Sequence, residues 1–175
     1  MQDLLNAWIA IQDFMARGGN VLILIFLVIF VMWTLIIERL MYYRLRFGRE
    51  AAQVIDAWES RHERRSWHAH QVRTAMLSQA RTNLNANVAF IKTLVAVCPL
   101  CGLLGTVTGM IEVFDVMSLL GNGNARAMAS GVSKATIPTM AGMVGALSGV
   151  FASSYVENRS NKLGGRLEDS LTMDH

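Results

Sequence analysis

Residues 21–37 read VLILIFLVIFVMWTLII, a run without any charge in which Thr34 is the only polar side chain. As a helix these residues rise about 26 Å, and residues 18–20 extend the run toward the roughly 30 Å of a bilayer core. A cleaved signal peptide is disfavoured, because the run starts far from the N-terminus, has no basic segment before it and has no small-residue cleavage site after it. We therefore expect residues 18–37 to form a retained transmembrane helix.

Two further uncharged runs predict two more spans. Residues 93–111 carry no charge and predict a span over residues 93–117, and residues 135–156 carry none and predict a span over residues 128–156. Both are rich in Gly, Ala, Ser and Thr, whereas the first span is rich in Leu, Ile, Val and Phe. Small residues let helices approach closely in lipid. We expect the first span to face lipid and the other two to face protein.

The distribution of Lys and Arg predicts the orientation of the chain. Ten of the 16 Lys and Arg residues lie in residues 38–92 and three lie in residues 157–175, whereas residues 1–20 and 118–127 hold one each. Because basic loops stay in the cytoplasm, the large loop and the C-terminal tail are expected there. The N-terminus and the short 118–127 connection are expected on the outer, non-cytoplasmic side, which is the periplasmic side if the membrane is a bacterial inner membrane. The basic charge is then a topology signal, and no nucleic-acid partner is expected.

The segments beside the spans are expected to be helical. Residues 1–17 predict an amphipathic interfacial helix, because their apolar residues recur at helical spacing. Residues 51–97 hold no Gly or Pro, which predicts a helical hairpin within the cytoplasmic 38–92 loop, with its second arm continuing into the second span. Asn83, Asn85 and Asn87 are weak helix formers that mark a bend. The side chains expected to pack the two arms together are Trp58, Trp67, Val72 and Met76.

The second span contains the stretch PLCGLLGTVTGM, residues 99–110. Gly102, Gly105 and Gly109 are three and four apart, so they share one helix face and favour close packing. Pro99 removes one backbone hydrogen bond from the span. Simple helix packing explains the glycines, but it explains less readily the polar Thr106 in the same span.

The third span contains the stretch GVSKATIPTMAGM, residues 131–143. Gly131, Thr139 and Gly142 lie on one small-residue stripe that steps by three or four. Pro138 frees the carbonyl of Lys134, which leaves an acceptor and a cation at one level of the span.

Together the two stretches resemble the second and third spans of the ExbB/TolQ/MotA family of proton-channel subunits. Three spans, an outside N-terminus and a basic cytoplasmic loop are similar to ExbB and TolQ. MotA has four spans, so a flagellar stator is disfavoured. The resemblance implies an all-α polytopic protein that assembles as a ring, usually a homopentamer, whose inner wall is formed by spans two and three.

The resemblance also implies function. An ExbD-like partner places single transmembrane helices in the pore, and an aspartate of that partner takes up and releases protons. Ring threonines correspond to Thr106 and Thr139. The proton-motive force is passed to a TonB-like protein that drives nutrient uptake through the outer membrane. We therefore expect an inner-membrane transport subunit, not an enzyme, with no cofactor; the alternatives are a TolQ-type envelope subunit and a passive helix-packing scaffold.

Lys134 departs from the resemblance, because ExbB and TolQ usually carry a glutamate at this position. A charge at mid-bilayer costs on the order of 2.5–3.5 kcal/mol on insertion scales. Two interpretations stay open: Lys134 snorkels to the outer interface, or it pairs with a carboxylate of the partner or the bundle and belongs to the proton path. Glu112 and Asp115 are either an entry vestibule for protons or ordinary interfacial residues.

The remaining reactive side chains predict no further chemistry. Cys98 and Cys101 flank Pro99 and are interpreted as small core residues, with a membrane thiol oxidoreductase as the alternative. The histidines at 62, 68 and 70 lie in a charged stretch without cysteines or zinc-like spacing. No metal site is expected.

Overall fold

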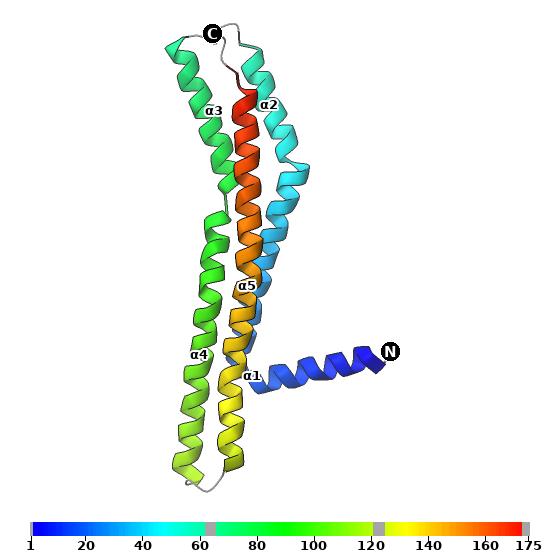
Figure 1. The fold of residues 1–175 in the computed structure, drawn as a ribbon, viewed down its shortest axis with the longest axis vertical. Helices are drawn as coiled ribbons and strands as arrows, with labels where there is room; N and C mark the ends of the chain where they lie inside the picture. The colour runs from blue at the N-terminus through cyan, green and yellow to red at the C-terminus, as the bar shows by residue number, and fades with distance from the viewer. Residues whose placement is uncertain (1, 62–65, 121–124, 173–175) are drawn as a thin grey trace. The chain divides into compact units, whose positions relative to one another are not determined.

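The computed structural model describes residues 2–61, 66–120 and 125–172. Every regular element within these ranges is a helix, and α1, α4 and α5 each contain a stretch long and apolar enough to cross a membrane. The all-α prediction and the prediction of three apolar spans are confirmed. The elements, drawn in Figure 1, are α1 (Gln2–Leu45), α2 (Phe47–Glu59), α3 (Trp67–Asn85), α4 (Val88–Leu120) and α5 (Ala125–Ser170).

Helix α1 consists of two helices joined at Gly19, whose φ of 64° and ψ of −166° are not helical. Only glycine adopts this conformation without steric cost. Figure 1 shows the chain turning there, so the predicted interfacial helix and the predicted first span meet at this residue. The side chains of residues 2–5, 7–18, 120 and 125–127 lie outside the described part of the chain, as do residues 121–124 at the centre of the 118–127 connection.

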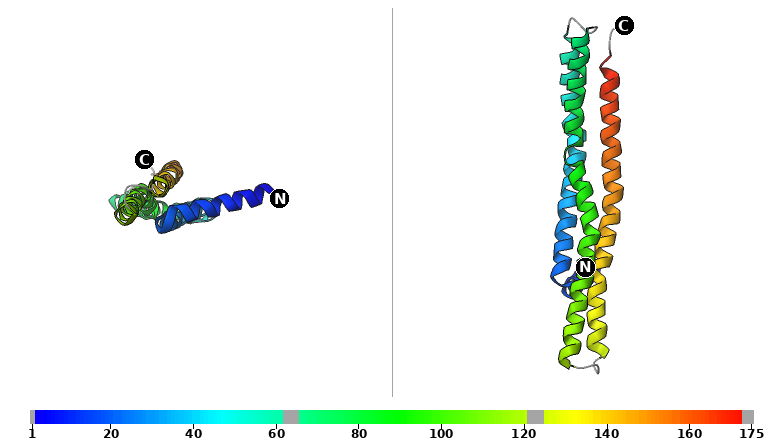
Figure 2. Two further views of the ribbon diagram at one scale, coloured as in Figure 1. Left: turned by 90° about the horizontal axis from the view of Figure 1, so that it is seen from below. Right: turned by 90° about the vertical axis from the view of Figure 1, so that its left-hand side faces the viewer.

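The chain divides into two compact units. The membrane unit comprises Met1–Trp33 and Thr93–Val150, and the arm unit comprises Thr34–Lys92 and Phe151–His175. In the membrane unit, α4 and α5 lie side by side, as Figures 1 and 2 show. The first span buries Leu22, Ile25 and Met32, which recur at helical spacing.

All three spans also expose large apolar side chains. Phe26 of the first span is 63% exposed, Leu100 of the second is 63% exposed and Met140 of the third is 67% exposed. The expected contrast between a lipid-facing first span and two protein-facing spans stays a prediction, because the single chain leaves apolar surface on each of them.

In the arm unit, helices α2 and α3 enclose an apolar interior together with the end of α5. Trp58, Leu77 and Leu167 are buried there. Val72 and Met76 line a cavity of about 310 Å³ that also contacts α2 and Leu167. The prediction that Trp67 packs the arms together is wrong: it is 72% exposed, in the first turn of α3 after the Ser66 N-cap.

The second arm leads into the second span through a break in the helix. Helix α3 ends at Asn85, α4 begins at Val88, and Asn87 between them has a φ of 62°. Asparagine tolerates this left-handed conformation better than most residues because its short side chain bonds the local backbone. The bend predicted from the three asparagines is confirmed, and the second arm reaches the second span through it.

Side chains from other helices satisfy the carbonyls at this break. The last four carbonyls of a helix have no partner within it. Arg39 donates to the carbonyl of Asn83 at 3.1 Å, and the Tyr43 hydroxyl donates to the carbonyl of Leu84 at 2.9 Å. Both side chains are buried. The end of α3 is therefore held by α1 rather than by solvent.

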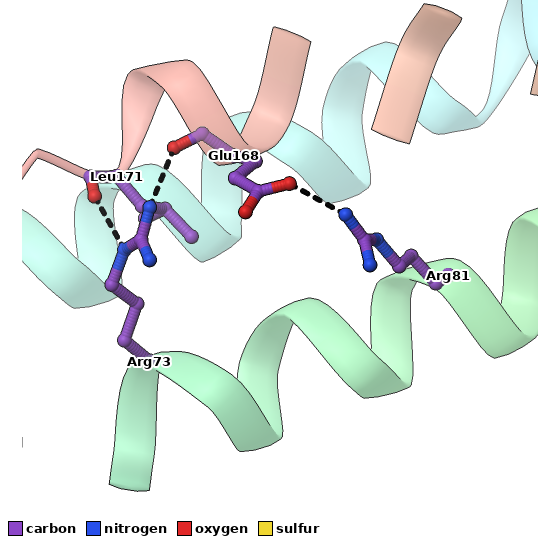
Figure 3. Close-up of polar contacts among 4 residues, drawn as sticks. All are labelled: Arg73, Arg81, Glu168 and Leu171. Carbon is purple, nitrogen blue, oxygen red and sulfur yellow. Dashed lines mark hydrogen bonds and ion pairs between the residues drawn. The ribbon is translucent and has the colours of Figure 1, made fainter. Parts of the chain in front are cut away.

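The end of α5 is satisfied in the same way. Arg73 of α3 donates to the carbonyls of Leu171 at 2.7 Å and Glu168 at 3.0 Å, and Arg81 pairs with the Glu168 carboxylate (Figure 3). The Trp58 indole of α2 donates to the carbonyl of Thr172 at 3.0 Å. Helices α2, α3 and α5 are thus joined through one helix terminus.

Candidate functional site

The seam between α4 and α5 is formed by backbone approach. A Cβ atom added to Gly109 would lie 2.6 Å from the Cα of Ala135, and one added to Gly142 would lie 2.6 Å from the carbonyl oxygen of Cys98. Real side chains avoid such distances, so both positions require glycine. The closest surfaces of the two helices are therefore main chain, as small-residue packing in lipid demands.

Of the other residues predicted for helix packing, all except Pro99 have a described contact along the same seam. Gly102 approaches the Cα of Thr139, Gly105 faces the ring of Pro138, and Gly131 faces Val113. Pro99 is half-buried within the continuous helix α4. The small-residue faces of the two helices thus meet each other inside one chain, and both prolines are accommodated without ending a helix.

The two candidate threonines lie half-buried on the two helices of this seam. The Thr139 hydroxyl crosses the seam and donates to the carbonyl of Gly102 at 2.9 Å. The Thr106 hydroxyl donates within its own helix to the carbonyl of Leu103 at 2.6 Å. Each hydroxyl oxygen has used its single donor and still has lone pairs that can accept a hydrogen bond.

Lys134 forms an ion pair across the seam. Its Nζ lies 3.2 Å from Oε2 of Glu112, and the two side chains are 43% and 61% exposed. Sequence reasoning treated the two residues separately and missed the pair. The signal was present, because Glu112 follows the uncharged run of one helix and Lys134 precedes the uncharged run of its antiparallel neighbour.

A cavity of about 380 Å³ opens beside this ion pair. Its polar wall consists of Asn20, Thr108, Glu112 and Lys134. Its remaining wall is formed by Gly19, Val21, Gly105 and Gly109. Thr106 and Thr139 do not line it, and Asp115 is exposed on α4 away from it. The predicted site residues therefore fall in two places. Thr139 bonds across the seam to Gly102, whereas Lys134 pairs with Glu112 beside the cavity.

Both cysteines are free thiols. Cys98 is buried at the seam, where its carbonyl faces Gly142, and Cys101 is half-buried one turn further along α4. This placement fits the interpretation of small core residues.

A known protein family matches most of the chain, including the site residues on α4 and α5. The family model described as MotA/TolQ/ExbB proton channel family matches residues 36–169, which is 134 of the 175 residues. The chain belongs to the MotA/TolQ/ExbB proton channel family. The match includes all of the candidate site residues on α4 and α5, as well as the arms α2 and α3.

One relative is described as putative biopolymer transport protein ExbB-like 1, from Synechocystis sp.. It is 45% identical over 60 residues, a stretch that covers 33% of this chain and 24% of the relative. The aligned stretch thus spans about a quarter of that relative. No solved structure matches the chain. The family assignment makes the chain a membrane protein of the proton-channel type and supports its resemblance to ExbB.

Proposed function

We propose that this chain is an ExbB-type subunit of a proton-driven motor in a bacterial inner membrane, with its N-terminus periplasmic and its C-terminus cytoplasmic. It forms a homo-oligomeric ring, a pentamer by analogy with the family, around an ExbD-like single-span partner. The ring converts the proton-motive force into work on a TonB-like protein for nutrient uptake through the outer membrane. The family match and the ExbB-like relative support this proposal.

The cross-helix contact of Thr139 carries the proposal. Residues 93–111 and 135–156 are uncharged, and the hydroxyl of Thr139 is held by the Gly102 carbonyl within them. A hydroxyl fixed through its donor presents an oxygen that accepts a hydrogen bond from a protonated carboxyl group. Thr106 offers the same chemistry from α4. Two such acceptors suit a partner carboxyl group that alternates between protonated and ionised states.

The test is proton flux through the reconstituted complex. The chain and an ExbD-like partner are placed together in liposomes, and a pH-sensitive dye reports flux under an imposed membrane potential. Thr106→Val combined with Thr139→Val is expected to lower the flux at least tenfold. Thr139→Ser, which keeps the hydroxyl, is expected to retain it.

Thr136→Val is the matched control. Thr136 lies on α5 one turn from Thr139, is exposed, and donates only to the carbonyl of Ser133 in its own helix. It is expected to leave the flux unchanged. Full flux in the Thr106/Thr139 double variant would contradict the proposal.

A passive helix-packing scaffold is the second candidate, and the glycine seam favours it. Gly102, Gly109 and Gly142 have steric reasons to be glycine within a single chain. A scaffold tolerates Val at both threonines while the complex still assembles, so the flux experiment separates the two candidates.

A TolQ-type role differs only in what the motor pulls. Deletion of the gene would then weaken the outer-membrane barrier. An ExbB-type role predicts loss of energy-dependent nutrient uptake with an intact barrier.

A further inference from the structure

Two ion pairs bracket the uncharged runs of α4 and α5. Lys92, which directly precedes the uncharged run of α4, pairs at 2.7 Å with Glu157, which directly follows the uncharged run of α5. At the other end of both runs, Glu112 pairs with Lys134 at 3.2 Å. The helices run in opposite directions, so each pair joins the end of one run to the start of the other.

The residue spacing between these pairs matches a bilayer. Along α4, 20 residues lead from Lys92 to Glu112. At about 1.5 Å per residue this is about 30 Å, the thickness of a hydrocarbon core. The 23 residues from Lys134 to Glu157 along α5 rise about 35 Å, which suits a tilted helix. Along each helix, this spacing fits charged residues at the two surfaces of a membrane.

The first span gives the same outer boundary. Gly19 and Asn20 line the cavity beside Glu112 and Lys134, so the start of this span lies at the level of that ion pair. The chain turns at Gly19, where the interfacial helix meets the span. An amphipathic helix lies in the headgroup region. Lys134 is thus at the outer interface, and α4 and α5 continue for about two turns beyond it.

We propose that the cavity beside Glu112 and Lys134 is a water-filled pocket, open to the outer side, that brings hydrated protons to the membrane level of Gly105. Its volume of about 380 Å³ is room for roughly ten waters at about 30 Å³ each. An amide, a hydroxyl, a carboxylate and an ammonium group line it, and these favour water over acyl chains. Gly105 and Gly109 line part of the rest of it without side chains of their own.

The pocket floor lies next to the candidate threonines. Gly105 precedes Thr106 and packs against Pro138, which precedes Thr139. Water in the pocket thus reaches Gly105, the residue before Thr106, and Gly105 separates it from Pro138. The proton-supply part of the inference rests on the proposed function, whereas the presence of water does not.

Thiol labelling tests the pocket. Thr108→Cys is placed in a chain carrying Cys98→Ala and Cys101→Ala, in membrane vesicles that expose the periplasmic face and contain the ExbD-like partner. A membrane-impermeant methanethiosulfonate reagent is added outside, because only a hydrated thiol ionises and reacts. Thr108→Cys is expected to react at least tenfold faster than Val107→Cys, a neighbour that is 51% exposed but does not line the pocket. Labelling of Thr108→Cys is expected to lower proton flux, and labelling of Val107→Cys is not.

Each outcome bears on a separate claim. Equal labelling rates, or reaction from the inner side alone, overturn the water-filled pocket. Fast labelling without a change in flux overturns the supply of protons through it. A complex that labels as expected but never conducts contradicts the proposed function and leaves the pocket standing. If the alanine substitutions prevent assembly, Asn20→Cys in the otherwise native chain is the second probe, because the tryptic peptide around it holds no other cysteine.

Discussion

The glycines at the seam of α4 and α5 in the membrane unit and the glycines of the arm unit have different surroundings. In the membrane unit, a Cβ on Gly142 would meet the backbone of Cys98 and Gly102, and one on Gly109 would meet the backbone of Ala135. In the arm unit, a Cβ on Gly48 or Gly165 meets nothing within 4 Å. Glycine is a packing requirement in the first case and leaves unused space in the second.

Polar contacts differ between the two units as well. In the arm unit, Arg39, Tyr43 and Arg73 donate to carbonyls at helix ends, and buried aromatic and aliphatic side chains fill the interior. In the membrane unit the seam relies on main-chain approach, and the side-chain bonds described across it are those of Thr139 to Gly102 and of Lys134 to Glu112. Burial from water drives packing in the arms, whereas lipid offers no such gain and close contact must replace it.

The largest effect is expected from Trp58→Ala, which tests packing in the arm unit. The side chain is 1% exposed and its indole donates to the carbonyl of Thr172, just beyond the end of α5. Truncation of a buried tryptophan costs about 3–5 kcal/mol. The variant should lose the arm unit's cooperative unfolding transition while α4 and α5 stay inserted in the membrane. Limited proteolysis in detergent would detect this as cleavage confined to residues 47–85, and an unchanged pattern would contradict it.

Gly142→Ala is expected to have the next largest effect. Alanine is the better helix former, but its methyl group would lie 2.6 Å from the Cys98 carbonyl, and backbone cannot yield as a side chain does. Overpacking of this kind costs about 1–3 kcal/mol. Thermal unfolding in nanodiscs should show a lower midpoint. A raised midpoint would mean that the seam is looser than the structure shows.

Arg73→Lys is expected to cost about 1 kcal/mol, the net worth of a hydrogen bond. The guanidinium reaches the carbonyls of both Glu168 and Leu171, and an ammonium group lacks this fork geometry. Faster amide exchange over residues 168–172 would report the loosened end of α5. Arg44→Lys, at an exposed site on α1, is the control and should leave exchange there unchanged.

Gly165→Ala has the smallest expected effect and the opposite sign to Gly142→Ala. It adds a methyl group in open space within α5, so only helix propensity changes. The expected gain is about 0.8–1 kcal/mol. A higher unfolding midpoint for Gly165→Ala beside a lower one for Gly142→Ala would be the sharpest measure of the difference between the two units.

Sequence reasoning reached the three apolar spans, the helical arms and the bend at the asparagines, because each depends on contiguous composition or local backbone preference. It failed for Trp67, since a helical pattern does not say which side of a short helix meets its neighbour. It also missed the capping roles of Arg39 and Arg73, whose acceptors lie 44 and 98 residues away in the chain.

The free energy of transfer into lipid and the helix propensity of a segment are both sums over neighbouring residues. The amino-acid sequence alone therefore determined that the chain is helical and that three of its segments are apolar enough to cross a membrane. Pairing depends instead on the rotation and register of one helix against another. Only the packed structure therefore joins Thr139 to Gly102 and Lys134 to Glu112. The same packing leaves a polar cavity beside the first span, which no one-dimensional pattern records.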